Sequence, residues 1–382
     1  MKTVSIIGLG YVGLPLACLC STKGHTTYGI DVDTEKVKAI NNKENPIDDD
    51  FVSQTLKDIN LRATTEGDKE LSESDVIIIC VPTPVDKRMS PILKFIKIAT
   101  EKIRNNLKKG QLIILESTVH PGTTEDIVKP ILEESGLKDG IDFYLSHCPE
   151  RIDPGNEQWT IKNIPRVIGS TSEKGKELSK EFYSSILESD ILVLSGAKEA
   201  EATKIMENSF RDINIAFINE MAKSFDKANI DIMEVIKGAS SKPFAFMPHI
   251  PGCGVGGHCI PVDPYYLIEK ARQIGFDHQF LSLARKINES MPTYTVHILT
   301  EELNKIGKAL NGSKIGLYGI SYKKNIGDIR ESPSLKIIKR LKEKGANLHI
   351  YDPFSKEENN VNNLNELIEK SDYLIICTNH KE

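Results

Sequence analysis

The stretch TVSIIGLGYVG, residues 3–13, decides the fold of the N-terminal part of the chain. A short apolar, β-branched run leads directly into the glycine-rich turn GLGYVG, and the pattern LPLACLCSTKG after it is helical. A second strand pattern, TTYGIDVD, ends at Asp31, 18 positions after the last glycine of the turn. This order of strand, GxGxxG turn, helix and strand with a terminal acid predicts a Rossmann dinucleotide-binding fold.

The turn itself supplies the first predicted cofactor contacts, which are Gly8, Gly10, Tyr11, Val12 and Gly13. Its first glycine permits the tight turn, its second lets a pyrophosphate approach the backbone, and its third lets helix and strand pack closely. The N–H groups at the start of the helix attract phosphate. Asp31 would accept hydrogen bonds from the adenosine ribose and would repel a 2′-phosphate, so NAD is predicted rather than NADP. A phosphate-free turn of the same shape is the alternative.

Composition bounds the remaining possibilities. A chain of 382 residues is long enough for two or three domains, and its 39% hydrophobic and 27% charged residues are typical of a globular protein. The net charge of -5 argues against a nucleic-acid or membrane-surface partner. The seven scattered cysteines without a CxxC motif favour a reducing, cytoplasmic compartment. The first 20 residues could be taken for a lipoprotein signal, but their glycines and Pro15 interrupt its apolar core.

Strands and helices continue to alternate up to about residue 150, with apolar strands in SDVIIICVPTP, GQLIILESTV and DFYLSHCPE. This alternation predicts a parallel sheet that is covered by helices on both faces. Polar residues follow the strands, namely Thr83, Thr118, Glu150 and Arg151. Because ligands of such sheets bind beyond the carboxyl ends of the strands, we expect a cleft there, although threonine and glutamate at strand ends are also ordinary caps.

A single long helix is predicted for residues 197–228. Its middle is apolar on nearly every face, so we expect that part to be buried and to form a dimer contact. Lys204, Asn208 and Arg211 nevertheless form one polar stripe at i, i+4 and i+7. On a buried helix this stripe would line a polar cavity, and on a surface helix it would simply face solvent.

A smaller parallel α/β unit is predicted to begin with SKIGLYGISYKKN. Its first loop carries Lys323, Lys324 and Arg330, which could hold phosphate or could be solvated surface charges. The sequence stops just after the third predicted strand, so we expect this unit to be incomplete. The resulting domain ranges are 1–196 for the dinucleotide-binding domain, 197–308 for a central helical domain and 309–382 for the second Rossmann-like domain.

The segment PGCGVGGHCIPVDPYYL, residues 251–267, places Cys259 four residues before Asp263. A turn would need the glycines but not the cysteine, and a buried strand would not contain so many glycines. Together with GLGYVGLP, VPTP, ESTVHPGT, CPERIDPGN, NSFRDINIAFINE and SYKKNIGDIRESPS, this segment resembles the nucleotide-sugar 6-dehydrogenases, the UDP-glucose/GDP-mannose dehydrogenase superfamily. The motifs PERIDPGN and SSKPFAFMP are most similar to the UDP-N-acetylglucosamine branch, with UDP-N-acetylmannosamine enzymes as near relatives.

The resemblance implies a four-electron oxidation of a sugar C6 alcohol to a carboxylate, with NAD as acceptor, in a homodimer joined through the long helix. Cys259 would trap the aldehyde as a thiohemiacetal and then carry a thioester that water hydrolyses. The implied catalytic residues are Cys259, Lys204, Asn208, Asp263, Thr118 and Glu150. The implied substrate contacts are Glu150, Arg151, Ile152, Lys204, Asn208, Arg211, Gly256, Tyr322 and Lys323. Asp31, Lys36, Thr83, Thr118 and Arg330 join the glycine-rich turn as implied NAD contacts, and no metal site is expected.

Some positions depart from the family pattern. UDP-glucose enzymes carry a second glutamate where this chain has Pro154, and Cys253 replaces the usual proline of the glycine-rich loop. Lys242 and His249 do not match the acetylmannosamine branch, so UDP-N-acetylglucosamine is favoured as substrate, with UDP-N-acetylmannosamine or UDP-glucose as alternatives.

Three rival functions stay open. A two-electron β-hydroxyacid dehydrogenase would share the fold but need no cysteine. A nucleotide-sugar binder without activity would follow from the short third unit. A zinc protein would use the pairs His147–Cys148 and His258–Cys259, which lack the usual spacing of zinc ligands.

Overall fold

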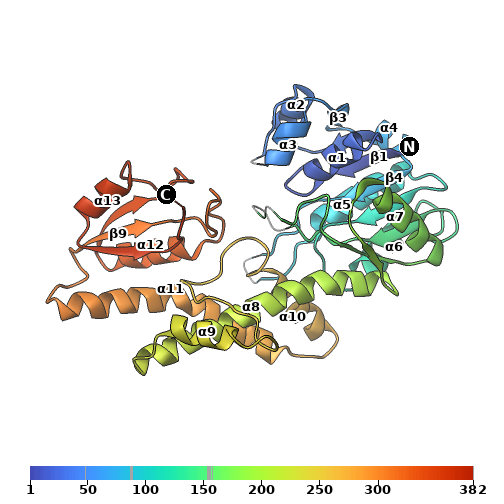
Figure 1. Cartoon of the computed structure of the whole chain (residues 1–382). Helices are drawn as coiled ribbons and strands as arrows, with labels where there is room; N and C mark the ends of the chain where they lie inside the picture. Colours follow the sequence, from blue (N-terminus) through green and yellow to red (C-terminus); the bar gives the residue numbers. More distant parts are fainter. Residues whose placement is uncertain (48, 87–88, 153–155, 157, 382) are drawn as a thin grey trace. The chain divides into compact units, whose positions relative to one another are not determined.

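The computed structural model describes residues 1–47, 49–86, 89–152, 156 and 158–381. The chain forms two compact units (Figure 1). The first contains Met1–Met206 and Tyr265–Lys270, and the second contains Glu207–Pro264 and Ala271–Glu382. Each unit is described by itself below.

The first unit is built on a sheet of eight strands among its described residues, in the order β3-β2-β1-β4-β5-β6-β7-β8. The strands are β1 (Thr3–Ile7), β2 (Thr26–Ile30), β3 (Leu61–Thr64), β4 (Val76–Ile79), β5 (Leu112–Leu115), β6 (Tyr144–His147), β7 (Arg166–Ser170) and β8 (Ile191–Val193). The order turns back at β1 and β4, as in a doubly wound Rossmann sheet, which confirms the predicted fold class.

One pairing differs from the predicted parallel sheet, because β6 and β7 are antiparallel. The described residues that connect them form no helix, and a parallel pair would need a crossover connection of a dozen or more residues, usually helical. The sequence did not predict β3, β7 or β8. All three are short, and β7 begins with an arginine, which is unusual in an apolar strand.

Helices cover both faces of this sheet (Figure 1). They are α1 (Gly13–Thr22), α2 (Thr34–Asn41), α3 (Asp50–Thr55), α4 (Asp68–Glu73), α5 (Lys94–Asn106), the π-helix η1 (Thr124–Val128), α6 (Lys129–Glu133) and α7 (Glu173–Ile186). Alternate strand residues enter two separate cores, for example Ile78 with α1 and α7 and Ile77 with α5 and α6. This period of two places apolar side chains on both faces of every central strand.

The central helices are α8 (Ala197–Lys227), α9 (Ile232–Ser240), α10 (Asp263–Gln273) and α11 (Gln279–Lys305). The predicted long helix ends within one residue of α8. The expectation that its middle is buried on all faces was wrong in part. Ile205 and Ile218 are buried, but Phe210 and Phe217 are 48% and 54% exposed. These two rings are seven residues apart and therefore lie on one side of the helix.

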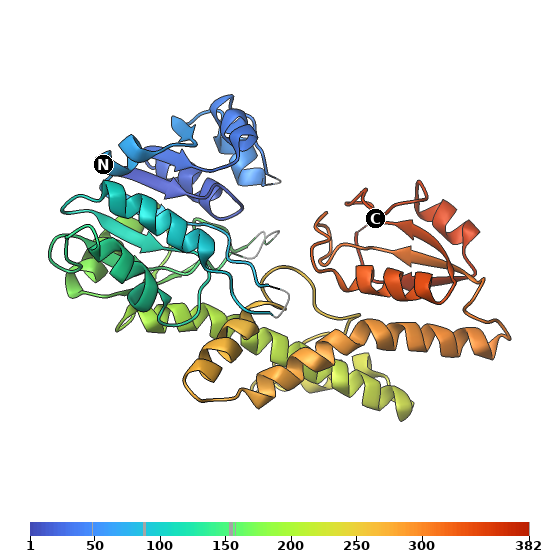
Figure 2. The ribbon, with the colours of Figure 1, turned by 180° about the vertical axis from the view of Figure 1, so that it is seen from behind.

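The third part of the chain is the predicted small parallel sheet, in the order β10-β9-β11. Its elements are β9 (Lys314–Tyr318), α12 (Pro333–Glu343), β10 (Asn347–Tyr351), α13 (Leu364–Lys370) and β11 (Tyr373–Ile376). One face packs on α12 and on the C-terminal half of α11, and the other packs on α13 (Figure 2). None of the described helices has the length and apolarity needed to cross a membrane.

Candidate functional site

The glycine-rich turn between β1 and α1 has the backbone that a dinucleotide site needs. Gly8 has a φ of +94°, and a Cβ on it would lie 2.6 Å from the Cys80 carbonyl oxygen. A Cβ on Gly13 would lie 1.9 Å from the Gly8 carbonyl oxygen, so strand and helix meet more closely than any side chain allows. A Cβ on Gly10 would contact nothing within 4 Å. The turn is thus closed by its outer glycines and open at Gly10.

The other turn residues lie at the start of α1. Tyr11 is 47% exposed, and Val12 is half-buried and directly precedes the helix. Open space at Gly10 beside a helix N-terminus fits a pyrophosphate, which such N–H groups bind. These residues therefore fit NAD, the predicted cofactor.

Asp31 ends β2 beside this turn. Its Oδ2 accepts hydrogen bonds from the Leu9 N–H at 2.8 Å and from Lys36 Nζ at 3.0 Å, and its Oδ1 accepts the Asp33 N–H at 3.0 Å. Burial works to raise the pKa of Asp31, but these hydrogen bonds outweigh it and hold the pKa below its usual value. A fixed carboxylate at this position suits ribose hydroxyls, and the two predicted NAD contacts Asp31 and Lys36 are in direct contact.

The predicted residues beyond the strand ends lie as follows. Thr83 follows β4, and its carbonyl oxygen accepts a hydrogen bond from the buried Tyr266 hydroxyl. Thr118 follows β5 and is half-buried. Glu150 follows β6 and is only 3% exposed. Its Oε1 accepts the N–H groups of Arg151 at 2.6 Å and Ile152 at 2.7 Å, so the carboxylate shapes the segment that contains both predicted substrate contacts. The departure at Pro154 lies outside the described residues.

Lys204 lies on α8 where its charge reaches the ends of β5 and β6. Burial, assisted by the Lys204 charge, lowers the pKa of His147 to about 3, so this imidazole is neutral near pH 7. The same lysine is among the charges that act on Glu116, directly after β5. The predicted catalytic lysine is thus placed at the carboxyl edge of the sheet, with Glu116 and His147.

Cys259 lies in the turn that leads into α10. Its carbonyl oxygen accepts the N–H groups of Val262 at 3.0 Å and Asp263 at 2.8 Å. Asp263 is 3% exposed, and its Oδ2 accepts a hydrogen bond from Asn208 Nδ2 at 2.5 Å. The second unit therefore brings together three of the predicted catalytic residues, Cys259, Asp263 and Asn208.

The glycine-rich loop before Cys259 packs against the third part of the chain. A Cβ on Gly256 would lie 2.7 Å from Tyr322 Cβ and 2.9 Å from Pro333 Cδ. The Gly257 N–H donates to the Arg330 carbonyl oxygen at 3.1 Å. The predicted contacts Gly256, Tyr322 and Arg330 are thus neighbours. The loop needs glycine at position 256 for close packing within the protein, in addition to the implied contact with substrate.

The remaining predicted residues differ in exposure. Lys323 is half-buried, whereas the Arg330 side chain is half-exposed and forms an ion pair with Asp328. Arg211, the last residue of the predicted polar stripe, is exposed. Asn208 and Lys204 are half-buried. The stripe therefore runs from a partly buried end to a solvent-facing end, between the two alternatives that the sequence left open.

A buried polar network that the sequence analysis missed supports the base of the cysteine loop. Asp212 Oδ1 accepts from Arg285 Nη1 at 2.6 Å and from Asn288 Nδ2 at 2.8 Å. Asn219 donates to Asn288 at 2.9 Å and accepts the Gly252 N–H at 3.0 Å. The network joins α8, α11 and the loop. The sequence contained a signal for this network, since Asp212 and Asn219 are seven residues apart and lie on one side of the largely apolar middle of the helix.

Cys253, which replaces the family proline, is partly buried against the core of the third part of the chain. Hydrogen bonding from the Cys377 thiol, followed by Thr295, lowers the pKa of Cys253 despite its burial. Among the described residues no group of His, Cys, Asp and Glu side chains is placed to hold a metal ion. His147–Cys148 and His258–Cys259 belong to different units.

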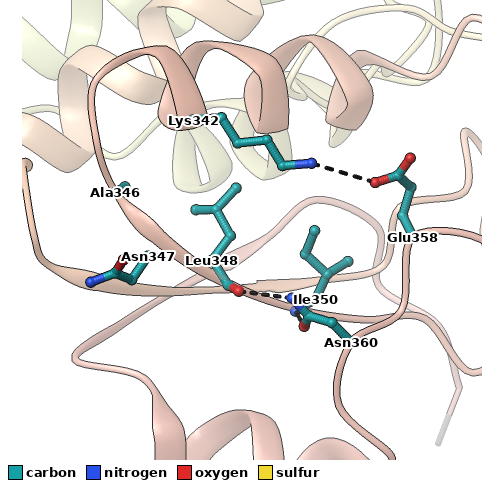
Figure 3. Close-up of a pocket in the computed structure, with 7 residues that line it drawn as sticks. All are labelled: Lys342, Ala346, Asn347, Leu348, Ile350, Glu358 and Asn360. Carbon is teal, nitrogen blue, oxygen red and sulfur yellow. Dashed lines mark hydrogen bonds and ion pairs between the residues drawn. The ribbon is translucent and has the colours of Figure 1, made fainter.

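A cavity of about 420 Å³ lies along the edge strand β10 (Figure 3). Its lining contains one ion pair, between Lys342 and Glu358 at 3.7 Å. The lining residues are Lys342, Ala346, Asn347, Leu348, Ile350, Glu358 and Asn360. None of the residues predicted to be functional lines this cavity.

Several known proteins similar to this chain are nucleotide-sugar dehydrogenases. A UDP-N-acetyl-D-mannosamine dehydrogenase from Methanococcus maripaludis is 36% identical over 389 residues, which cover 100% of this chain and 86% of that protein. A UDP-N-acetyl-D-glucosamine 6-dehydrogenase from Pseudomonas aeruginosa is 36% identical over 93% of this chain and 83% of its own length. The solved structure of a UDP-D-ManNAc dehydrogenase from Pyrococcus horikoshii has a TM-score of 0.93 and 35% identity, and covers 99% of this chain and 89% of that one.

The dinucleotide turn, the strand-end residues and the cysteine loop, together with these relatives, define an NAD-dependent nucleotide-sugar dehydrogenase. The chain belongs to the UDP-glucose/GDP-mannose dehydrogenase family. The NAD-binding domain of the family matches residues 2–187 of this chain, the central domain matches residues 198–290, and the UDP-binding domain matches residues 316–382.

Proposed function

We propose that this protein oxidises the C6 hydroxyl of a UDP-N-acetylhexosamine to the carboxylate, for the synthesis of a surface polysaccharide or glycan precursor. An N-acetylated sugar in the substrate is supported by the names of two relatives, one a UDP-N-acetyl-D-mannosamine dehydrogenase and the other a UDP-N-acetyl-D-glucosamine 6-dehydrogenase. The sequence motifs favour UDP-N-acetylglucosamine, and the relatives make UDP-N-acetylmannosamine the alternative to test beside it. The proposed domain ranges are 1–196, 197–308 and 309–382.

The observation that carries this proposal is the group formed by Cys259, Asp263 and Asn208 at the start of α10. A thiol is needed because the aldehyde from the first oxidation must be trapped before it can be oxidised again. Two molecules of NAD, bound one after the other, would supply the hydride acceptors for the two oxidations.

The residues of the chain carry out the remaining steps. The C6 hydroxyl passes its proton to water, and Lys204 stabilises the alkoxide that develops at the C6 oxygen. As the Cys259 sulfur adds to the aldehyde carbon, the thiol proton passes to the aldehyde oxygen to give a thiohemiacetal. After the second oxidation the carbonyl carbon remains bonded to sulfur as a thioester.

Water then ends the cycle. Its oxygen bonds to the thioester carbon, the carbon–sulfur bond breaks, and the electron pair returns to Cys259 as thiolate. Asp263, which accepts a hydrogen bond from Asn208, orients this water together with Thr118. Glu150 assists removal of the water proton. Arg151, Ile152, Arg211, Gly256, Tyr322 and Lys323 hold the nucleotide sugar, and Arg330 contacts the cofactor.

A second copy of the chain is the proposed partner of α8. The exposed rings of Phe210 and Phe217 lie on one side of this helix, and the segment after α9 exposes Phe244 and Met247 at 67% and 61%. Exposed apolar side chains in such number mark an interaction surface. Sedimentation analysis of the wild type should show a dimer, and Phe217→Asp should shift it towards monomer. A monomeric wild type would contradict this proposal.

The function is tested by supplying UDP-GlcNAc, UDP-ManNAc, UDP-glucose and GDP-mannose and measuring NADH and sugar acid. We expect two NADH per acid formed with a UDP-N-acetylhexosamine. Cys259→Ser should abolish acid formation, whereas the matched variant Cys253→Ala should retain it. One NADH per substrate, unaffected by Cys259→Ser, would instead indicate a two-electron hydroxyacid dehydrogenase. No NADH from any nucleotide sugar would indicate a binding protein.

A further inference from the structure

Four side chains form a buried cluster below the carboxyl edge of the large sheet. Glu116 follows β5, Glu150 follows β6, Arg166 begins β7 and Tyr183 lies on α7. All four are at most 3% exposed, and Arg166 and Tyr183 are fully buried. A fully buried arginine is rare unless it is paired, so its partners define its role. We refer to these four residues as the carboxylate cluster.

The antiparallel pairing of β6 and β7 explains why Arg166 meets Glu150. Ser146 pairs with Ser170 and His147 with Gly169. Continuing this register beyond β6 places residue 150 opposite residue 166. Arg166 Nη1 lies 2.7 Å from Glu150 Oε2. The strand reversal that the sequence did not predict is therefore what delivers a cation to the end of β6.

The second carboxyl of the cluster, Glu116, lies near the same guanidinium nitrogen. Glu116 Oε2 lies 3.9 Å from Arg166 Nη1, and Glu116 Oε1 accepts a hydrogen bond from the Tyr183 hydroxyl. The Arg166 guanidinium carbon lies 6.0 Å from the centre of the Tyr183 ring. Glu116 and Tyr183 are thus further neighbours of the Arg166 guanidinium, and they are joined to each other by a hydrogen bond.

The two carboxyls differ in charge because one cation cannot neutralise both. Glu150 is closer to Arg166 and also accepts two backbone N–H groups, so it is the anion. Burial raises the pKa of Glu116; the Arg166 charge opposes this rise and the Glu150 charge adds to it. Glu116 is therefore the carboxyl that holds a proton. The charged or titratable groups that act on Glu116 are Arg166, Glu150, Tyr183, Lys204, Cys20, Cys80 and Cys148.

We propose that Arg166 is a positioning residue that fixes Glu150 for hydrolysis of the acyl intermediate, and that Glu116 and Tyr183 hold Arg166 in place. This inference rests on the proposed function, in which Glu150 assists proton removal from the attacking water. A carboxylate offers about four acceptor sites. Two backbone N–H groups occupy Glu150 Oε1, while Oε2 lies 2.7 Å from the guanidinium as an ion pair and has no hydrogen-bond partner among the described residues. An acceptor site on Oε2 is thus left for a water proton, and the cluster determines where that site points.

The first test removes one buried hydroxyl from α7 at two places. Tyr183→Phe deletes the donor to Glu116. Ser179→Ala removes another buried hydroxyl of α7, which donates a hydrogen bond at 2.7 Å to the uncharged Ser146 hydroxyl on β6. Rapid mixing of enzyme, UDP-sugar and NAD follows NADH formation, and acid quenching with intact-protein mass measurement follows the acyl group on Cys259. Tyr183→Phe should slow acyl hydrolysis on the order of tenfold, the size expected for a supporting residue, and leave the first NADH burst unchanged. Ser179→Ala should behave as the wild type.

The second test uses the pH profile of acyl hydrolysis. Ionisation of Glu116 would add a second negative charge beside Arg166 and weaken its hold on Glu150. The glutamine side chain in Glu116→Gln cannot ionise. The rate of acyl hydrolysis in this variant should therefore lack a pH-dependent change that the wild type shows near neutral pH. Arg166→Lys, which keeps the charge, should retain more hydrolysis than Arg166→Met.

The outcomes separate the two proposals. Wild-type activity with unchanged hydrolysis rates and pH profiles in Tyr183→Phe and Glu116→Gln would overturn the positioning role alone. Equal slowing of the first burst and of hydrolysis in Tyr183→Phe would also overturn it, because a general structural defect affects both steps. A wild type that forms no acyl group on Cys259 from any nucleotide sugar would overturn the proposed function and this inference with it.

Discussion

Replacing either of two glycines in the dinucleotide turn by alanine adds the same methyl group, but the structure predicts opposite consequences. In Gly13→Ala the new Cβ would lie 1.9 Å from the Gly8 carbonyl oxygen and 3.1 Å from Cys80 Cβ. The obstructing atom at 1.9 Å belongs to the backbone and cannot rotate away. In Gly10→Ala the new Cβ meets no other part of the protein within 4 Å, and the backbone at Gly10 is outside the left-handed region.

The expected magnitudes follow from these contacts. Overpacking of this kind lowers the free energy of unfolding by about 1–3 kcal/mol, which corresponds to a fall of about 2–12 °C in the Tm of a unit of this size. Gly10→Ala should keep or slightly raise stability, by at most about 1 kcal/mol, because alanine restricts the unfolded chain. Its methyl group would instead occupy the space open to the pyrophosphate. Loss of one charge-assisted hydrogen bond, about 1.5–3 kcal/mol, raises the Kd for NAD about 10- to 150-fold.

Differential scanning calorimetry and calorimetric titration with NAD measure the two quantities on the same protein samples. We expect Gly13→Ala to have a lower Tm than the wild type. We expect Gly10→Ala to keep the Tm of the wild type but to bind NAD with a higher Kd. A Gly10→Ala variant that binds NAD as tightly as the wild type would refute the placement of the pyrophosphate. A Gly13→Ala variant with an unchanged Tm would refute the close contact of strand and helix.

Three further predictions concern other residues. The wild type should show a higher kcat/KM with NAD than with NADP, and Asp31→Ala should narrow the gap; equal values in the wild type would contradict the ribose role of Asp31. Burial raises the pKa of Glu201 from 4.5 to about 7, so the wild type should lose up to about 3 kcal/mol of stability as the pH rises from 4.5 to 7. Urea unfolding at pH 5 and pH 8 should show that Glu201→Gln lacks this loss of stability. If the unfolding free energy changes equally between the two pH values in the variant and in the wild type, the loss does not come from Glu201. Asn208→Leu removes a donor to the buried Asp263 and should lower the unfolding free energy by about 1.5–3 kcal/mol, a change that urea unfolding would detect or rule out.

Local patterns predicted the parts of the fold in which one segment decides its own structure. The GxGxxG turn with Asp31 identified the dinucleotide domain, because the backbone needs of such a turn can be met only by glycine at fixed positions. The apolar run of α8 identified a helix that ends within one residue of the expected end. The choice of Asn208 and Asp263 as candidate catalytic residues followed from family resemblance, and no pattern in the sequence predicted the hydrogen bond between them.

Contacts that depend on strand pairing could not be predicted in this way. Arg166 appears in the sequence as a basic residue at the start of a short apolar run, and nothing local shows that β7 runs antiparallel to β6. Only that register delivers the guanidinium to Glu150. The exposure of Phe210 and Phe217 was missed for a related reason. Helical periodicity shows which residues share a face, but it does not show whether a face is covered within one chain.

The choice of Cys259 as nucleophile can be argued by comparing all seven thiols. Burial raises the pKa of Cys18 to about 11, and burial also raises the pKa of Cys20, Cys80 and Cys148. These four stay protonated in the core of the first unit, where a thiol is a small apolar group. Hydrogen bonding with Cys253 raises the pKa of Cys377, so the thiolate of that pair belongs to Cys253.

Cys253 is therefore the competitor to consider, since a thiolate is the reactive form of cysteine. Its sulfur, however, is engaged with Cys377 and Thr295 and packs against the core between α11 and the small sheet. Cys259 lies instead in the turn whose next residues include Asp263, the carboxylate bound by Asn208. Of the three thiols outside the core of the first unit, only Cys259 has within four residues a buried carboxylate that can orient water. Acyl transfer to Cys253, or loss of activity in Cys253→Ala with Cys259→Ser still active, would reverse this assignment.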